Sequence, residues 1–328
     1  MNVLVLHHDD LDGRVAGYVA MNSNNWGSGA PHQVSRIEMS YDKDPPWDAI
    51  EAADVVVVVD FSFPPEVFKK IQDLGKQLIW IDHHKTAIAA VELAINAREL
   101  APIEGKRALT KPSGARLTWE YFHPDKPVPT VVEIVSLYDT WEHKNDVRIL
   151  SIVAALSATD IFSPAIGEAT IMKTLLENDA RATAMLDTLE SQGMAIRKAE
   201  LMHGANLVIT NGYRVQFDGK WWWACNGSRI NSLVFEQARE LAPERLKDVD
   251  GWMPYKFTGR YWEVTLYRAA DAGWFDVSAI AKEHGGGGHP GAAGFNSVDP
   301  PCPCPDEDTV WIPETPERNR VTLPSPRS

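Results

Sequence analysis

Histidine and aspartate side chains gather near the start of the chain, in a pattern that suits metal binding. Residues 7–13 have the sequence HHDDLDG and follow the apolar run 2–6. Within this segment, His8, Asp10 and Asp12 alternate. Crowded carboxylates repel one another unless a cation lies among them, and imidazole and carboxylate groups are ligands for divalent metals. A polar turn explains the segment equally well, so other parts of the chain must decide between the two interpretations.

Two later stretches place similar residues directly after apolar runs. Five consecutive valines, residues 55–59, lead into Asp60, and the run 77–81 leads into the sequence DHH at residues 82–84. Uninterrupted apolar runs of this kind, including 2–6, predict strands that are buried on both faces, as in the parallel sheet of an α/β protein. Because ligands bind beyond the carboxyl ends of such strands, we predict a metal centre where the three strands end.

A fourth contribution is expected from Asp139. Residues 130–133 have the sequence TVVE, and this capping-box spacing predicts a helix that carries Ile134, Leu137 and Tyr138, with Asp139 near its end. A carboxylate beside Trp141 also suits a simple helix cap. With the three strand ends in view, we predict that Asp139 is a metal ligand.

A glycine-rich segment lies far along the chain, at residues 285–295, and has the sequence GGGGHPGAAGF. Its glycines let backbone N–H groups approach an anion closely, and His289 adds a side-chain donor. The small residues that follow suit close helix packing beside a phosphate. A glycine run alone is usually a flexible linker, but a linker needs neither the His-Pro pair nor the second small-residue cluster.

Composition limits the classes of protein that fit. The chain has 328 residues, 44% hydrophobic and 23% charged, which predicts a globular protein of one large or two ordinary domains. The formal net charge of −13 disfavours binding to long duplex nucleic acid but permits a short nucleotide. Three cysteines make no disulfide framework, no apolar run is long enough for a membrane span, and no basic segment precedes the first strand. We therefore expect a cytoplasmic protein without membrane partners.

The pattern divides the chain into four parts. They are residues 1–168, which carry the metal-binding motifs; a helical connector, 169–206; a second lobe, 207–298; and a proline-rich tail, 299–328, expected to be disordered. The second lobe is predicted to contain strands at 207–209, 213–215, 221–223 and 262–266 and helices at 231–241 and 278–283. The three tryptophans at 221–223 are expected in the core and at a strand edge, rather than as base-stacking residues.

Five of these pieces together resemble the DHH phosphoesterase superfamily, in the branch that carries the DHH-associated C-terminal domain. In chain order they are HHDDLDG (7–13), VVVVVDF (55–61), WIDHHKTA (80–87), SLYDTW (136–141) and GGGGHPGAAGF (285–295). The DHH triplet alone is a weak signal, whereas five motifs in the family's order across residues 1–295 are a strong one. Within the superfamily, the chain looks most like the short-oligoribonuclease (nanoRNase) members.

The resemblance implies an α/β fold. A parallel-sheet N-terminal DHH lobe would carry catalysis, a smaller α/β C-terminal lobe would bind substrate, and the helical connector would join them. It also implies two divalent ions, with manganese expected first and magnesium or cobalt as alternatives. One ion would be held by His8, Asp10 and Asp60, and the other by Asp12, Asp60, His83 and Asp139.

Further residue roles follow from the same resemblance. Asp82 would orient or complete the metal cluster, and His84 would face the reacting phosphate, so both are predicted catalytic residues. Arg268 would contact substrate, and residues 113–115 approximate a family element in which the glycine is a departure. The predicted phosphate-binding residues of the second lobe are Gly286, Gly287, Gly288 and His289.

The implied activity is metal-dependent hydrolysis of short oligoribonucleotides to mononucleotides, by a hydroxide activated between the two metals. The alternatives are a 3′-phosphoadenosine 5′-phosphate phosphatase and a phosphodiesterase for cyclic or linear dinucleotides. From another class, a non-catalytic nucleotide sensor would keep the fold without cleaving. The sequence leaves open the choice between RNA and DNA, the polarity of cleavage and the oligomeric state, a homodimer included.

Overall fold

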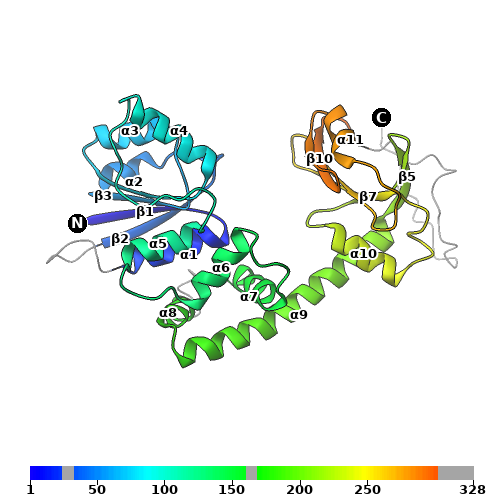
Figure 1. Ribbon diagram of the computed structural model, residues 1–328, viewed down its shortest axis with the longest axis horizontal. Coiled ribbons are helices and arrows are strands. Elements are labelled where there is room, and N and C mark those ends of the chain that lie inside the picture. Colours follow the sequence, from blue (N-terminus) through cyan, green and yellow to red (C-terminus); the bar gives the residue numbers. More distant parts are fainter. Residues whose placement is uncertain (24–32, 160–167, 302–328) are drawn as a thin grey trace, which may run out of the picture. The chain divides into compact units, whose positions relative to one another are not determined.

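In the computed structural model, which describes residues 1–23, 33–159 and 168–301, the chain divides into two units (Figure 1). Unit 1 is Met1–Arg197 and unit 2 is Lys198–Ser328, and each has a sheet of its own. Nearly all of the predicted tail, 299–328, lies outside the described residues. The predicted division into four parts therefore stays a prediction.

A parallel sheet forms the centre of unit 1. Its strand order is β2-β1-β3-β4, and every neighbouring pair is parallel. The strands are β1 (Asn2–His8), β2 (Gln33–Met39), β3 (Val55–Val59) and β4 (Gln77–Ile81). All five valines of β3 are buried, as the predicted double coverage requires. Both faces of this sheet are therefore packed against other elements.

Helices cover the two faces of this sheet (Figure 1). Val57 faces an apolar cluster that includes residues of α1, α5, α6 and α7, and Val58 faces a cluster that includes residues of α2, α3 and α4. The helices are α1 (Leu11–Met21), α2 (Trp47–Ala52), α3 (Pro65–Asp73), α4 (Lys85–Asn96), α5 (Gly114–Phe122), α6 (Thr130–Asp139), α7 (Val147–Ala158), α8 (Glu168–Glu177) and α9 (Ala180–Asn211). Met172 of α8 and Leu186 of α9 complete the first cluster, so the predicted connector begins as part of a core.

Unit 2 is built on a mixed sheet with the strand order β5-β6-β7-β8-β10-β9, in which β6 and β7 are parallel and the other pairs are antiparallel. Its elements are β5 (Tyr213–Phe217), β6 (Lys220–Asn226), α10 (Ser232–Leu241), β7 (Gly251–Phe257), β8 (Trp262–Arg268), α11 (Val277–Glu283), β9 (Gly287–His289) and β10 (Ala292–Ser297). Trp222 and Trp223 enter the cores on its two faces, as predicted. Both units are α/β, and the predicted fold class is confirmed.

Two predictions about strands were wrong or incomplete. Residues 207–209 were predicted as a strand, yet they lie in the last part of α9. Val208 is buried there in a cluster with Ala205 and Trp223, so tertiary packing at helical spacing overrides the strand preference of the branched residues. Strand β2 was not predicted, because it is a sheet edge whose side chains are mostly half exposed and mostly polar.

The helix predicted to end near Asp139 is present as α6, but its predicted capping box was wrong. Thr130 is the first residue of α6 and caps nothing: the N-cap is Pro129, and the Thr130 hydroxyl donates to Asn178. The expected partner Glu133 instead accepts from Arg116 at 2.6 Å. The small residues after His289 form strand β10, and Ala293 of this strand packs in a cluster with Val277 and Ala281 of helix α11.

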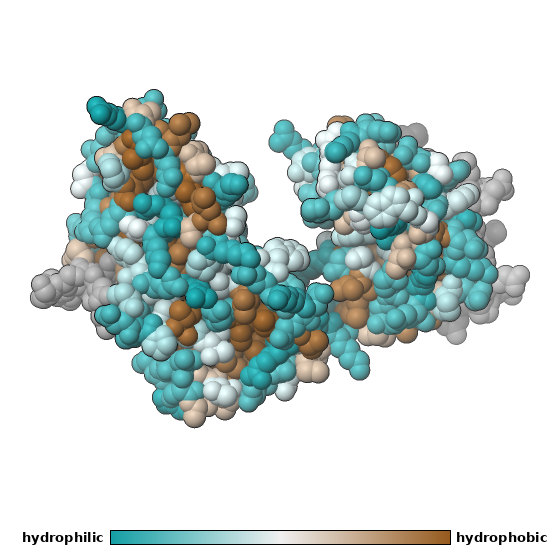
Figure 2. All heavy atoms as spheres, viewed as in Figure 1, coloured by the Kyte–Doolittle hydropathy of each residue, from teal (hydrophilic) through white to brown (hydrophobic). Residues whose placement is uncertain are grey.

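The surface of each unit is largely hydrophilic on the face seen in Figure 2, with apolar residues gathered in separate patches. Within the described residues, no helix combines the length and the apolar character that crossing a membrane requires.

Candidate metal centre

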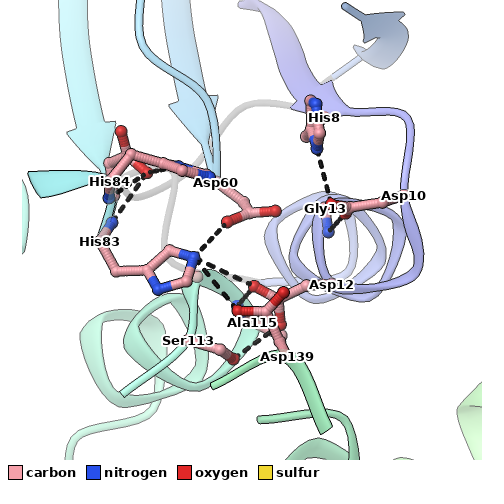
Figure 3. Close-up of polar contacts among 12 residues, drawn as sticks. His8, Asp10, Asp12, Gly13, Asp60, His83, His84, Ser113, Ala115 and Asp139 are labelled. Carbon is pink, nitrogen blue, oxygen red and sulfur yellow. Dashed lines mark hydrogen bonds and ion pairs between the residues drawn. The ribbon is translucent and has the colours of Figure 1, made fainter. Parts of the chain in front are cut away.

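The carboxyl ends of β1, β3 and β4 lie side by side, and predicted metal ligands follow them directly. His7 of β1 lies opposite Val59 of β3, and Val59 lies opposite Ile81 of β4. The residues that come next therefore leave the sheet at one edge. Asp139, the last residue of α6, points its carboxylate toward the same place (Figure 3).

Ligand atoms of the predicted residues converge in three overlapping groups, and within each group they lie within 4.8 Å of one another. The groups are His8, Asp10 and Asp60; Asp12, His83 and Asp139; and Asp60, His83 and His84. The first is the set predicted for one ion. The second contains three of the four ligands predicted for the other, and Asp60 Oδ1 lies 3.2 Å from His83 Nε2. The fold thus brings all six predicted ligands together.

Asp60 lies at the centre of this cluster and lacks ordinary partners. Its side chain is 1% exposed, and neither carboxylate oxygen accepts a hydrogen bond, although His83 Nε2 is close to Oδ1. Burial, followed by the charges of Asp12 and Asp10, raises the pKa of Asp60 well above its ordinary value. A buried carboxylate without a partner is costly in free energy. A cation bound to Asp60 would remove that cost.

The backbone around Asp60 is specialised for this arrangement. Asp60 has a φ of 52°, in the left-handed region that non-glycine residues seldom adopt and that aspartate tolerates better than most. Gly114, the first residue of α5, packs against its side chain: a Cβ atom at Gly114 would lie 2.4 Å from Asp60 Cβ and Oδ1. The glycine that departs from the family pattern is therefore required for the close approach of α5.

Asp12 is held from two directions in the first turn of α1. Its carboxylate accepts hydrogen bonds from Ser113 Oγ at 2.6 Å and from the backbone N–H of Ala115 at 3.3 Å. His83 Nε2 lies 4.0 Å from Asp12 Oδ2 and 3.4 Å from Asp139 Oδ2 (Figure 3). Burial, followed by the charge of Asp139, raises the pKa of Asp12 to about 6. Two acidic groups thus compete for one histidine unless a metal ion joins them.

Asp82 is satisfied by hydrogen bonds and holds His84 in place. It accepts from the backbone N–H of His83 at 2.7 Å, from the hydroxyl of Ser62 and from His84 Nδ1 at 2.7 Å. Burial acts to raise the pKa of Asp82, but the His84 hydrogen bond and charge outweigh it, so the pKa is lowered. The same hydrogen bond raises the pKa of His84. Asp82 therefore has the geometry of an orienting residue, as one of its two predicted roles requires.

His8 and Asp10 form a more exposed pair. His8 Nδ1 lies 2.7 Å from Asp10 Oδ2, while Asp10 Oδ1 accepts from the backbone N–H of Gly13 and caps α1. The hydrogen bond to Asp10 raises the pKa of His8. Asp10 thus has one oxygen committed to the helix and one turned toward the cluster.

The predicted phosphate-binding residues lie in unit 2, at the β9–β10 hairpin. Gly286 and Gly288 are explained by packing, because a Cβ atom would lie 2.1 Å from Gly294 O at the first and 2.6 Å from Ala293 Cα at the second. Gly287, in contrast, has open space around the Cβ position. Within unit 2 these glycines are therefore not equivalent.

Arg268 ends β8 beside this hairpin. Its backbone N–H donates to Gly291 O at 3.1 Å, and its guanidinium donates to Phe275 O at 3.0 Å. His289 is exposed. The fold thus places Arg268 next to the turn of the glycine-rich segment.

Two neighbours of the cluster were not predicted from the sequence. Ser62 hydrogen-bonds Asp82 from the strand end that also carries Asp60, and the alternation of residues after β3 could have indicated it. Tyr41 packs its ring on Phe61, with centroids 4.8 Å apart, and on His8 at 5.7 Å. Tyr41 lies just beyond strand β2, which the sequence did not reveal.

Comparison with solved structures places the fold. The chain is similar to the DHH domain of a protein described as a member of a family of ribosomal proteins, with 13% identity, a TM-score of 0.50 and coverage of 90% of this chain and 82% of that one. This shows the DHH-domain fold. Lower scores relate the chain to a pGpG-specific phosphodiesterase of Vibrio cholerae (14% identity, TM-score 0.43, 91% and 94% covered). A similar low score is found for RecJ from Thermus thermophilus in complex with Mn²⁺ (17% identity, TM-score 0.41, 91% of this chain and 49% of that one covered).

Comparison of amino-acid sequences also finds a similar protein. An uncharacterized protein, R106, of Acanthamoeba polyphaga mimivirus is 24% identical over 251 residues. The match covers 73% of this chain and 52% of the viral protein, so the chain matches about half the length of that relative. No protein-family model matches the chain. The fold that the resemblance implies is thus confirmed, while the superfamily and the nanoRNase assignment stay predictions.

Proposed function

We propose that this protein is a metal-dependent phosphodiesterase that hydrolyses short oligoribonucleotides to mononucleotides. The observation that carries the proposal is Asp60, whose two buried oxygens accept no hydrogen bond while two groups of ligand atoms share it. A carboxylate that would hold two divalent cations satisfies that description. Two adjacent cations serve phosphoester chemistry in phosphatases, polymerases and nucleases.

The donor set fits divalent metals. His8, Asp10 and Asp60 would hold one ion, and Asp12, Asp60, His83 and Asp139 would hold the other. Mixed imidazole and carboxylate donors suit Mn²⁺, and they also accept Mg²⁺ or Co²⁺. When bound, such cations act as Lewis acids on a phosphoryl oxygen and make water a stronger nucleophile at neutral pH.

The protein's own residues supply orientation and proton transfer. Asp82 fixes the His84 ring through the 2.7 Å hydrogen bond and favours its protonated form. A protonated His84 would donate to a phosphate oxygen and stabilise the charge that develops there. Ser113 and Ala115 hold Asp12 in position, so its carboxylate needs no rearrangement when substrate binds.

Residues of unit 2 are proposed to bind the substrate's phosphate. This proposal rests on three sets of hydrogen-bond donors: the side chain of His289, the backbone N–H groups of Gly286–Gly288 and the guanidinium of Arg268. The exposure of His289 and the position of Arg268 beside Gly291 support the assignment.

Purified protein with Mn²⁺ should release mononucleotides from end-labelled ribodinucleotides and ribotrinucleotides, and a chelator should abolish the reaction. The Asp60→Asn variant should be inactive, while Asp125→Asn, a matched change at an exposed aspartate outside the three ligand groups, should stay active.

The same assay separates the alternatives. If the protein leaves di- and trinucleotides intact but consumes 3′-phosphoadenosine 5′-phosphate or a cyclic dinucleotide, the proposed substrate is wrong. The protein would still be a phosphoesterase. Nucleotide binding without turnover of any of these compounds would identify a sensor instead. Asp82→Ala would then have no activity to remove.

A further inference from the structure

Two exposed aromatic residues, on different elements, are close to proposed metal ligands in the chain or in space. Trp141 is 84% exposed and Tyr41 is 61% exposed. Single exposed apolar residues are common on protein surfaces, so exposure alone does not indicate a function. What the two residues share is their association with the proposed ligands Asp139 and His8.

Trp141 follows Asp139 by two residues, so its Cα lies within about 7.6 Å of that ligand's Cα. The loop that carries it is firmly held: Trp141 N–H donates to Tyr138 O, and the N–H groups of Glu142 and His143 both donate to Leu137 O. The rigid loop therefore presents an exposed ring in a fixed place.

The backbone conformation at Trp141 supports a functional role. Its φ is 60°, in the left-handed region that costs a bulky residue about 1 kcal/mol or more. Core packing does not repay this cost, because the ring is largely exposed; its ring contact with His143 has centroids 5.9 Å apart. A glycine or asparagine would satisfy the loop at lower cost, so the indole itself is the feature that needs explaining.

Tyr41 lies beside the other group of ligands. Its ring packs against Phe61 and lies 5.7 Å from the ring of His8, a proposed ligand of the first ion. The ring of Tyr41 thus lies near His8, and Trp141 follows Asp139 by two residues on the loop after α6. Each proposed ion therefore has a ligand with an exposed aromatic residue nearby, in space at His8 and in the chain at Asp139.

We infer that Trp141 and Tyr41 are stacking surfaces for nucleobases of the substrate, which makes them specificity-determining residues. The inference rests on the proposed function and narrows its substrate class: the centre takes phosphodiesters that carry bases, in preference to polyphosphate or pyrophosphate. Every base offers an aromatic face, so stacking holds short oligonucleotides with little sequence preference. Stacking also leaves the reacting phosphate free to lie over the metal ligands.

The test compares a ribodinucleotide with the same compound lacking one base. Trp141→Ala is expected to raise KM for the dinucleotide about tenfold with little change in kcat, because one stacked base is lost. Trp141→Phe should recover most of the affinity. On the abasic analogue that lacks the stacked base, wild type and Trp141→Ala should have the same KM. Leu93→Ala, which removes a 72% exposed apolar side chain from α4, is the control and should leave both substrates unaffected.

A binding measurement makes the inference independent of turnover. A dinucleotide that contains 2-aminopurine should lose fluorescence on binding to wild type and keep most of it with Trp141→Ala. Equal quenching by both proteins, or an equal loss of activity on the intact and abasic substrates, would overturn the inference. Quenching without cleavage would overturn the proposed function and leave the stacking role standing.

Discussion

The metal-ligand cluster of unit 1 and the glycine hairpin of unit 2 were both predicted as functional segments, yet the structure accounts for them differently. In the hairpin, ordinary packing explains Gly286 and Gly288, whose hydrogens face the backbone of β10. In the cluster, ordinary packing leaves Asp60 without a hydrogen bond and raises the pKa of Asp12 to about 6. Packing within the fold therefore explains much of the glycine hairpin, but it does not explain the metal-ligand cluster.

This difference shows which observations point to a ligand. Glycines at close approaches are common wherever backbones pack, so they are weak evidence for anion binding. A buried carboxylate that lacks a partner is rare, and each case needs a cause. We therefore expect substitutions in the cluster to remove function outright, and substitutions in the hairpin to divide between stability and substrate binding.

The largest effect is expected for Asp60→Asn. Loss of the shared carboxylate should lower kcat/KM on a ribodinucleotide by about 10³-fold or more, because both proposed ions depend on it. His289→Ala should lower kcat/KM by only about 10- to 100-fold, the worth of one hydrogen bond to a charged phosphate. Steady-state kinetics at saturating Mn²⁺ measures both. A larger loss for His289→Ala than for Asp60→Asn would reverse the comparison.

The second largest effect is expected in how the stability of the cluster depends on pH. Folding raises the pKa of Asp12 from 3.8 to about 6, so in metal-free protein this carboxyl stabilises the fold fully below pH 3.8, and the stabilisation is lost as the pH rises through 6. Metal-free Asp12→Asn should gain stability over wild type across that interval, reaching about 3 kcal/mol above pH 6. Urea unfolding at a series of pH values tests this. If the difference in free energy of unfolding between the two proteins stays constant between pH 4 and 7, folding does not raise the pKa of Asp12.

The two kinds of glycine in the hairpin give a smaller contrast. Gly286→Ala places a Cβ atom 2.1 Å from Gly294 O and should lower the free energy of unfolding by about 1–3 kcal/mol. Gly287→Ala meets open space and should change stability by less than about 0.5 kcal/mol. If Gly287 binds phosphate through its N–H, this variant raises KM several-fold while remaining stable. Equal destabilisation by both substitutions would refute the distinction.

A moderate effect on catalysis is expected for the orienting residue. Asp82→Asn removes the charge that raises the pKa of His84, so activity that needs protonated His84 should decline at lower pH than in wild type. We expect kcat at neutral pH to fall about tenfold, in the range for residues that orient a functional histidine. Metal content should not change. An unshifted pH–rate profile would mean that Asp82 acts in another way.

The sequence predicted much of the fold and of the cluster because both rest on local signals. The valines of β3 and the residues after β1, β3 and β4 are contiguous, and a parallel sheet brings their ends together. The role of Gly114 could not be predicted, since it depends on contact with Asp60, 54 positions earlier in the chain. Tyr41 was missed with strand β2, whose half-exposed edge has no clear apolar pattern. The last turn of α9 was mistaken for a strand because its packing partners lie elsewhere in the sequence.

Metal stoichiometry tests the central claim most directly. Elemental analysis and calorimetric titration with Mn²⁺ should find two ions per chain in wild type and in the control variant Asp125→Asn. Asp60→Asn should show weakened binding at both positions, and Asp139→Asn should lose one ion and keep the other. Wild-type protein that binds no divalent ion, or an Asp60→Asn variant that binds two with unchanged affinity, would contradict the account.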